Sequence, residues 1–284
     1  MNQKITFLLS FSIVLNSFAQ NKKAYELFSA SGKKTSFSKL IKKAILSDLV
    51  LFGEQHNNPI AHWLELELVT ELSNKRKLVL GSEIFESDQQ EELNLYLKDS
   101  IDHSILSQRI KLWPNYETDY KALVDLAKTK QIPFVATNIP KKYATLVYKK
   151  GFEPLVDLDS NVKKYIAPQP IAYEPELPQY KKILTMMGEH GTPELVKAQA
   201  IRDATMAHFI SLKFSKENLF LHINGAYHSD YKEGIVWYLN KIAPQFNTIT
   251  ISTVEQESIK KLEAENINKA DFIICVPSTM TKTY

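Results

Sequence analysis

Short apolar runs alternate with segments of helical spacing along most of the chain. Runs bounded by glycine or polar residues predict strands buried on both faces, as in parallel sheets, at residues 49–52, 77–81, 132–137, 219–223 and 246–252, with a late edge strand or tail at 272–276. The intervening periodicity predicts helices at residues 37–46, 59–73, 88–97, 101–110, 119–130, from 192 onward, and 234–241. Because strand, helix and strand at this spacing form right-handed crossover units, the fold class is α/β, with a mostly parallel β-sheet flanked by helices.

Residues 141–191 interrupt this alternation. Helical pieces are expected at 141–148, 159–165 and 178–187, separated by the proline-rich stretch 167–175. We therefore predict a small all-helical insertion in this segment, and an α/β core domain made of residues 20–140 and 192–284. Such an insertion either acts as a lid or partner surface, or is a surface excursion without a role.

Ionisable side chains recur where the predicted strands end. Glu54 and His56 follow the first strand, Glu83 follows the second, and His228 follows the fourth, each a few residues at most after a glycine. Ligands of open α/β sheets bind at the carboxyl ends of the strands, so we expect these four groups to surround one pocket. Taken singly, each has a structural alternative: a helix-capping carboxylate, or an imidazole packed on a helical turn.

The helix after Thr192 carries a polar face. Gln199, Arg202, Asp203 and Met206 share one side of it by their i, i+3, i+4 and i+7 spacing. An arginine and an aspartate there could bind a substrate carboxylate and orient a histidine, or could form a solvated face. Position alone favours the solvated face.

Composition narrows the function and suggests an address. The 284 residues carry a net charge of +3, with lysines dispersed along the chain, which does not predict a nucleic-acid partner. Lys4, the apolar stretch 5–15 and the small residues Ser17 and Ala19 are typical of a secretory signal peptide at residues 1–19. Its apolar part is too short for a transmembrane segment, and none is expected elsewhere. We expect an exported protein, periplasmic or extracellular and soluble after cleavage.

Four motifs in this order resemble the ChaN-like haem-binding uptake proteins, within the Tiki, TraB and erythromycin-esterase-like superfamily. They are Gly53-Glu54-Gln55-His56, Gly81-Ser82-Glu83-Ile84-Phe85, the helical segment 199–207, and Asn224-Gly225-Ala226-Tyr227-His228. The resemblance implies a parallel sheet with a small helical domain. It also implies haem or iron acquisition for ChaN-like members, and metal-dependent hydrolysis for the Tiki-like branch.

Two functions follow from this. The first is an exported protein that binds haem, or another small-molecule ligand, between its helical insertion and a second copy of itself in a homodimer. Haem iron accepts Tyr, His or Met, and the candidate ligands in the insertion are Tyr173, Tyr180 and His190.

The alternative is a metal-dependent hydrolase working at the strand ends. In it Glu54, His56 and His228 hold a divalent metal ion, and Glu83 is the general base. Arg202 neutralises a developing oxyanion, and Asp203 completes the catalytic set.

Overall fold

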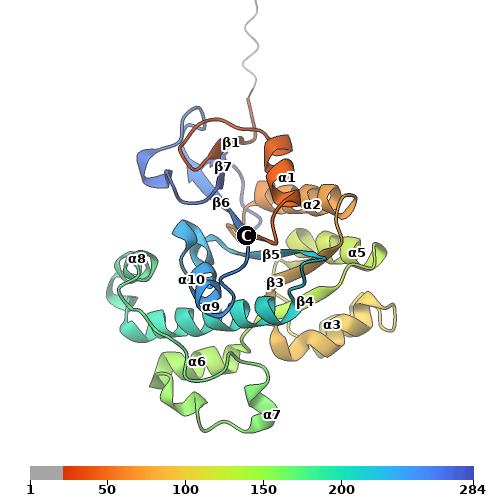
Figure 1. Ribbon diagram of the computed structural model, residues 1–284, viewed down its shortest axis with the longest axis vertical. Helices are drawn as coiled ribbons and strands as arrows, with labels where there is room; N and C mark the ends of the chain where they lie inside the picture. Colours follow the sequence, from red (N-terminus) through yellow and green to blue (C-terminus); the bar gives the residue numbers. More distant parts are fainter. Residues whose placement is uncertain (1–21) are drawn as a thin grey trace, which may run out of the picture.

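A computed structural model describes residues 22–284 as a seven-stranded sheet (Figure 1). The predicted signal peptide lies outside the described residues. The strands run β1-β7-β6-β2-β5-β3-β4 across the sheet, and every neighbouring pair is parallel except β1 and β7. Their bounds are β1 Glu26–Ser29, β2 Leu49–Glu54, β3 Leu78–Glu86, β4 Phe134–Asn138, β5 Leu219–Gly225, β6 Thr248–Gln256 and β7 Phe272–Pro277. The prediction of an α/β fold with a mostly parallel sheet is confirmed.

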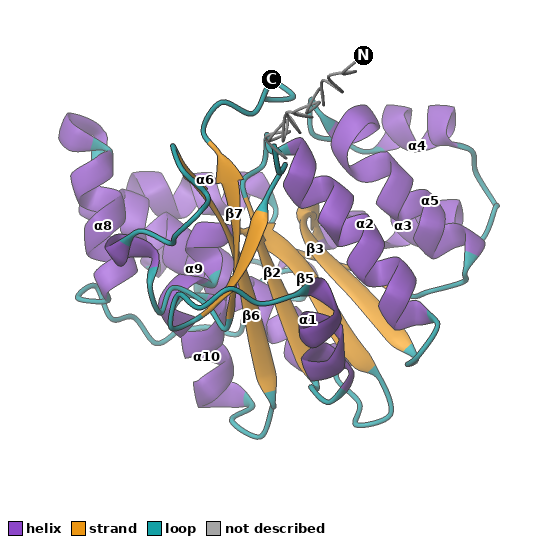
Figure 2. Ribbon diagram, turned by 90° about the horizontal axis from the view of Figure 1, so that it is seen from above, coloured by secondary structure: helices purple, strands orange, loops and turns teal. Residues whose placement is uncertain are grey.

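Helices cover both faces of the sheet (Figure 2). One face is covered by α1 (Phe37–Ile45), α2 (Pro59–Ser73), α3 (Gln90–Leu97) and α5 (Lys121–Thr129), with α4 (His103–Arg109) beside them. The other face is covered by α6 (Lys141–Lys150), α9 (Pro193–Lys213) and α10 (Ile235–Ile242), with α8 (Pro178–Met186) farther out. The short helix α7 (Ser160–Lys163) follows α6 in the chain.

The central strand shows why its sequence is apolar throughout. Val50 and Phe52 pack in the core beneath α2 and α5, whereas Leu49 and Leu51 pack beneath α9 and α10. Successive residues of a strand point to opposite faces, so a strand covered on both sides must be apolar at every position. Because β2 is packed on both faces, it holds the residues at its carboxyl end in defined positions.

Three predictions about strands need correction. The strand β1 was missed, because it is short and pairs antiparallel with β7. As a result β7 is an interior strand, and not the edge of the sheet. The strand β3 does not stop at Gly81 but continues to Glu86, with an irregularity in its pairing with β4 after Ser82. Side-chain pattern could not reveal that extension, because backbone pairing with β4 creates it.

Segment 141–191 packs mainly against α9. Ala144 and Val147 of α6 form an apolar cluster with Ile201, and Tyr180 of α8 packs with Val196 and Ala200. Helices α6 and α8 thus lie against α9, on the face of the sheet that α9 covers (Figure 2). None of the helices in residues 22–284 combines the length and apolar character needed to cross a bilayer.

Candidate functional site

The first part of the site is built at the end of β2. The carboxylate oxygen Glu54 Oε1 lies 2.7 Å from His56 Nδ1 and accepts a hydrogen bond from the Tyr120 hydroxyl at 2.5 Å. Burial alone would raise the pKa of Glu54, but hydrogen bonds from the His56 and His62 imidazoles hold it well below its usual range. Asn58 caps α2 directly after this turn by accepting from the Ile60 backbone N–H at 3.1 Å, which fixes where the helix begins.

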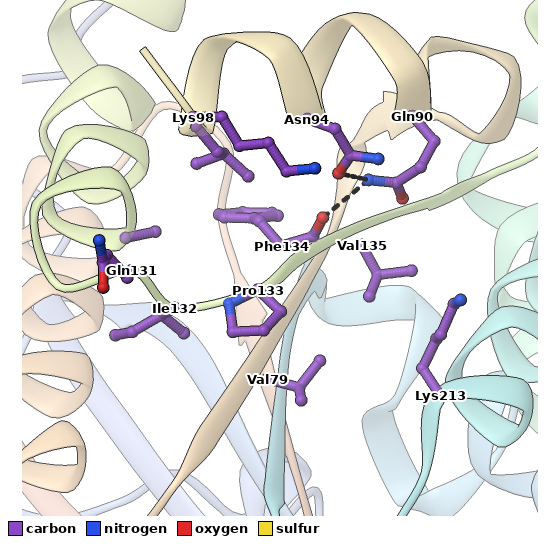
Figure 3. Close-up of a pocket in the computed structure, with 12 residues that line it drawn as sticks. Val79, Gln90, Asn94, Lys98, Gln131, Ile132, Pro133, Phe134, Val135 and Lys213 are labelled. Carbon is purple, nitrogen blue, oxygen red and sulfur yellow. Dashed lines mark hydrogen bonds between the residues drawn. The ribbon is translucent and has the colours of Figure 1, made fainter. Parts of the chain in front are cut away.

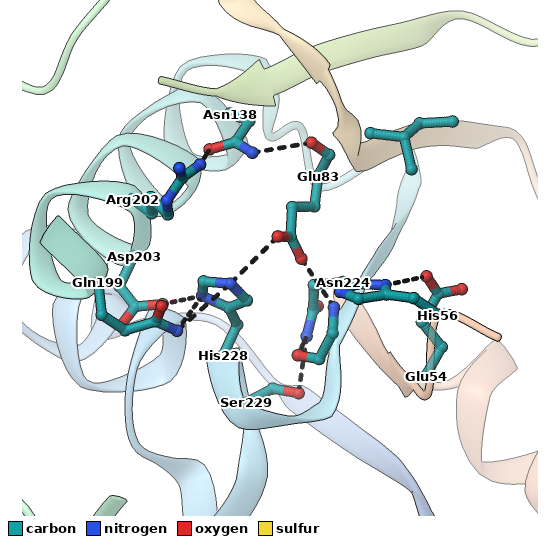
Figure 4. Close-up of polar contacts among 12 residues, drawn as sticks. Glu54, His56, Glu83, Asn138, Gln199, Arg202, Asp203, Asn224, His228 and Ser229 are labelled. Atoms are coloured by element: carbon teal, nitrogen blue, oxygen red, sulfur yellow. Dashed lines mark hydrogen bonds and ion pairs between the residues drawn. The ribbon is translucent and has the colours of Figure 1, made fainter. Parts of the chain in front are cut away.

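The second part connects β3 to β5 (Figure 4). The Gly225 backbone N–H donates to Glu83 Oε2 at 2.8 Å, and Glu83 Oε1 lies 3.2 Å from His228 Nε2. The Asn138 side chain, at the end of β4, donates to the Glu83 backbone carbonyl at 2.9 Å. Residues of three neighbouring strands therefore meet at Glu83, at its backbone carbonyl and at its carboxylate, as expected where parallel strands end together.

His228 is held between two carboxylates. Opposite Glu83, its Nδ1 lies 2.5 Å from Asp203 Oδ1 of α9, and the Tyr180 hydroxyl donates to Asp203 Oδ2 at 2.9 Å. Burial would lower the pKa of His228, but the charges on Glu83 and Asp203 raise it to about 10. At neutral pH this imidazole is a cation in a buried ion-pair network.

The two parts approach each other at Gly225. A Cβ atom added to Gly225 would lie 2.8 Å from His56 Nε2 and 3.5 Å from Glu83 Oε2. Only the absence of a side chain lets the imidazole of His56 lie so close to the β5 backbone. Glu54, His56, Glu83 and His228 therefore lie near one another at the strand ends, and a shared pocket lined by all four stays a prediction.

The polar face of α9 is not the solvated face that position favoured. Asp203 is fully buried on His228, so it orients a histidine. Arg202 is half-buried, and its guanidinium makes a long contact of 3.4 Å with Asn138 Oδ1. Together with Tyr148 and Gln199 it lines a hollow of about 290 Å³ that is available to an anionic ligand.

The predicted metal ligands Glu54, His56 and His228 do not form a compact ligand set. Both nitrogens of His228 face carboxylates, and His56 Nδ1 already lies against Glu54. Within residues 22–284, the group of three ligand atoms close enough to share an ion is Glu54, His62 and Glu65.

The three predicted haem ligands differ in how far they are buried and in what they contact. Tyr180 is buried and its hydroxyl is bonded to Asp203, so its role in this structure is to position that carboxylate. Tyr173 is half-buried, with its ring 5.2 Å from the ring of Phe152. His190 is exposed in the short turn Gly188–His190 that follows α8.

Sequence reasoning missed several residues of this site. Tyr120 lies in a π-helical turn (Tyr116–Tyr120), a local irregularity that the apolar periodicity does not show. Tyr227 is exposed one residue before His228, and its hydroxyl donates to Met186 Sδ at 2.8 Å. The sequence carried one signal for Tyr227: it lies inside the motif that ends in His228.

One further cavity, of about 600 Å³, lies beside the edge strand β4 (Figure 3). Its lining includes Gln90, Asn94, Phe134 and Lys213, and none of the predicted site residues. Gln90 donates to the Phe134 carbonyl at 2.9 Å and so takes part of this strand's hydrogen-bonding edge. This cavity is separate from the chemistry at the strand ends.

Comparison with known proteins gives the chain a family. ChaN of Campylobacter jejuni, a structure described as showing cofacial haem binding, superposes with a TM-score of 0.67 and 17% identity over 88% of this chain and 96% of that one. A variant of erythromycin esterase EreC in its open conformation gives a TM-score of 0.51 and 12% identity, over 89% and 97%. RETICULATA-RELATED 5, a chloroplastic protein of Arabidopsis thaliana, is 24% identical over 85% of this chain, which spans 35% of that protein's length.

The two structural similarities support the fold alone. The family model for haem-binding uptake proteins of the Tiki superfamily, ChaN, matches residues 40–239, from α1 through both parts of the strand-end site to α10. The chain therefore belongs to the ChaN family of haem-binding uptake proteins.

Proposed function

We propose that this protein binds haem as its cargo, on an exposed surface made of Met186, Met187 and Tyr227, which we call the Met-Tyr surface. The observation that carries the proposal is the contact between the exposed Tyr227 hydroxyl and the exposed Met186 sulfur, beside the strand-end site of a ChaN-family chain. The side chains of Met186 and Met187 are 59% and 47% exposed. Neighbouring methionines left open to water are typical of a binding surface.

The chemistry of these residues suits a ferric porphyrin. Tyrosine, histidine and methionine all ligate haem iron. Tyr227, in the middle of the short turn Ala226–His228, and His190, at the end of the short turn Gly188–His190, are both exposed. Arg202 supplies a guanidinium for a propionate, because its contact with Asn138 is long and leaves most of its donors free. Tyr227 is the preferred iron ligand in this proposal, and His190 remains a candidate.

The test is haem titration followed by absorbance. The full chain should develop a Soret band at saturating haem, and Tyr227→Phe should shift that band and weaken binding by at least about tenfold, since a direct metal ligand is lost. Tyr173→Phe is the matched control, because it makes the same change, loss of one tyrosine hydroxyl, at a residue outside the Met-Tyr surface. No spectral change with the unmodified chain contradicts haem binding; an effect confined to Tyr173→Phe moves the ligand.

We also propose export and a role in haem or iron acquisition, motivated by the sequence of residues 1–19. The mature protein should begin at Gln20. N-terminal sequencing of protein recovered from the periplasm or medium tests this, and finding Met1 there would contradict it. An exported haem-binding protein would capture haem outside the cytoplasmic membrane.

Hydrolysis at the strand ends is the second candidate, favoured by the protonated His228 between two carboxylates and by the nearby Arg202. It ranks below haem binding because Glu83 is a weak base: burial would raise its pKa, but the charge on His228 and the hydrogen bonds from His228 and Gly225 lower it. Glu83→Gln should abolish turnover of an ester substrate if this activity exists. Retention of turnover in that variant would exclude Glu83 as the base.

A further inference from the structure

The far side of Glu54 faces a second buried cluster. His62 Nδ1 lies 3.3 Å from Glu54 Oε2 and 3.4 Å from Glu65 Oε2, and all three side chains are at most 5% exposed. Two of the carboxylate oxygens there, Glu54 Oε2 and Glu65 Oε1, have no hydrogen-bond partner. Buried carboxylate oxygens are ordinarily satisfied by a hydrogen-bond donor or by a cation, so these two atoms mark a place where a metal ion fits.

We propose that Glu54, His62 and Glu65 form a buried binding site for a divalent transition-metal ion of the Zn²⁺ type. Ligand atoms about 2.0–2.1 Å from one tetrahedral ion lie about 3.3 Å apart, which is the spacing between His62 Nδ1 and the two carboxylate oxygens. A direct hydrogen bond would be shorter, at about 2.7–3.2 Å. One imidazole with two carboxylates is a ligand set that suits Zn²⁺.

The surrounding contacts orient these ligands. His62 Nε2 lies 3.1 Å from the His56 backbone carbonyl, so with an ion bound the ring would keep its proton on Nε2 and present Nδ1 to the ion. The other oxygen of Glu54 is held by His56 and Tyr120, which leaves Oε2 free for the ion. Metal-binding histidines and carboxylates are commonly fixed by hydrogen bonds of this kind.

Sequence spacing also supports the site. His62 and Glu65 are three positions apart on α2, so both project from one side of the helix toward the end of β2. The segment after β7 covers this region, because the Thr283 hydroxyl donates to Asp119 Oδ2 at 2.7 Å and Asp119 lies 3.6 Å from His62 Nε2. The ion would therefore be shielded from bulk water. This site is distinct from the Met-Tyr surface and does not depend on haem.

Calorimetric titration of the chelator-treated full chain with Zn²⁺, in the absence of haem, tests the proposal. The unmodified chain should bind one Zn²⁺, and His62→Gln and Glu65→Gln should each weaken binding by more than about 100-fold. The matched control is His208→Gln, which changes a half-buried histidine on α9, outside the proposed site. This variant should bind Zn²⁺ as the unmodified chain does. His228→Gln should also retain the ion, which separates this site from one made of Glu54, His56 and His228.

Thermal unfolding with and without Zn²⁺ guards against variants that fail to fold. Glu65→Gln keeps the size and shape of the side chain, so it should fold and lose only the Zn²⁺-dependent rise in Tm. Absence of Zn²⁺ binding by the unmodified chain overturns the proposal. Undiminished binding in folded Glu65→Gln, or loss of the ion in folded His228→Gln, overturns it equally.

Discussion

The Gly225 backbone amide donates to the side chain of Glu83, so the end of β5 is bonded to a carboxylate 142 residues earlier in the chain. That bond holds Glu83 beside His228 on one side and His56 on the other. A backbone donor fixes the carboxylate without a flexible partner that must itself be ordered. The consequences of this arrangement can be measured.

Gly225→Ala should destabilise the fold by about 1–3 kcal/mol, because the new methyl group would lie 2.8 Å from His56 Nε2 in a packed site. Urea unfolding measures the change in the free energy of unfolding. In the double variant with His56→Ala the clash is removed, so the two changes should cost less together than the sum of their separate costs. Simple additivity would show that His56 does not lie against Gly225.

Tyr180→Phe should destabilise the fold by about 1–3 kcal/mol, because Asp203 would lose a hydrogen bond while remaining buried. Tyr173→Phe is the control, since its half-buried ring packs on Phe152 and should tolerate the loss of its hydroxyl. Thermal unfolding of both variants is the measurement. A haem Soret band lost in Tyr180→Phe at unchanged stability would instead support Tyr180 as an iron ligand.

The free energy of unfolding should fall as the pH rises from neutral toward 10. His228 has a folded-state pKa of about 10 against an ordinary value of 6.5, so the folded state holds its proton more tightly than the unfolded chain does. This contribution is complete below pH 6.5 and is lost as the pH passes the folded-state value. Urea unfolding across this range should show a shallower decline for His228→Gln.

Haem should bring two copies of the chain together at the Met-Tyr surface. Burying the exposed Met186 and Met187 against a second copy would remove apolar area from water. Sedimentation with and without haem measures the assembly, and Met187→Glu should prevent it by placing a charge at the contact. Leu212→Glu, at a 59% exposed position near the end of α9, is the control. A monomer at saturating haem would restrict the proposal to binding by a single chain.

The α/β class and the positions of Glu54 and His228 at strand ends could be predicted from the hydrophobic pattern alone. A strand covered on both faces must be apolar along its length, so its end is visible where polar residues resume. The same rule failed at β3, because Glu83 lies inside a strand that β4 extends past Gly81. It also missed β1, which exists only through its antiparallel pairing with β7.

Which of the ionisable side chains contact one another is visible only in the packed structure. Spacing on α9 put Asp203 and Arg202 on one face, but only packing against the sheet buried Asp203 on His228 and left Arg202 at a hollow. Likewise, the apolar pattern of α2 does not show whether His62 is buried or exposed to solvent. Only the packing of α2 against the end of β2 places Glu54 beside it. The hydrophobic pattern of the sequence reflects which residues are buried on folding. A set of ligands depends instead on distances between segments far apart in the chain, and only the packed sheet defines those distances.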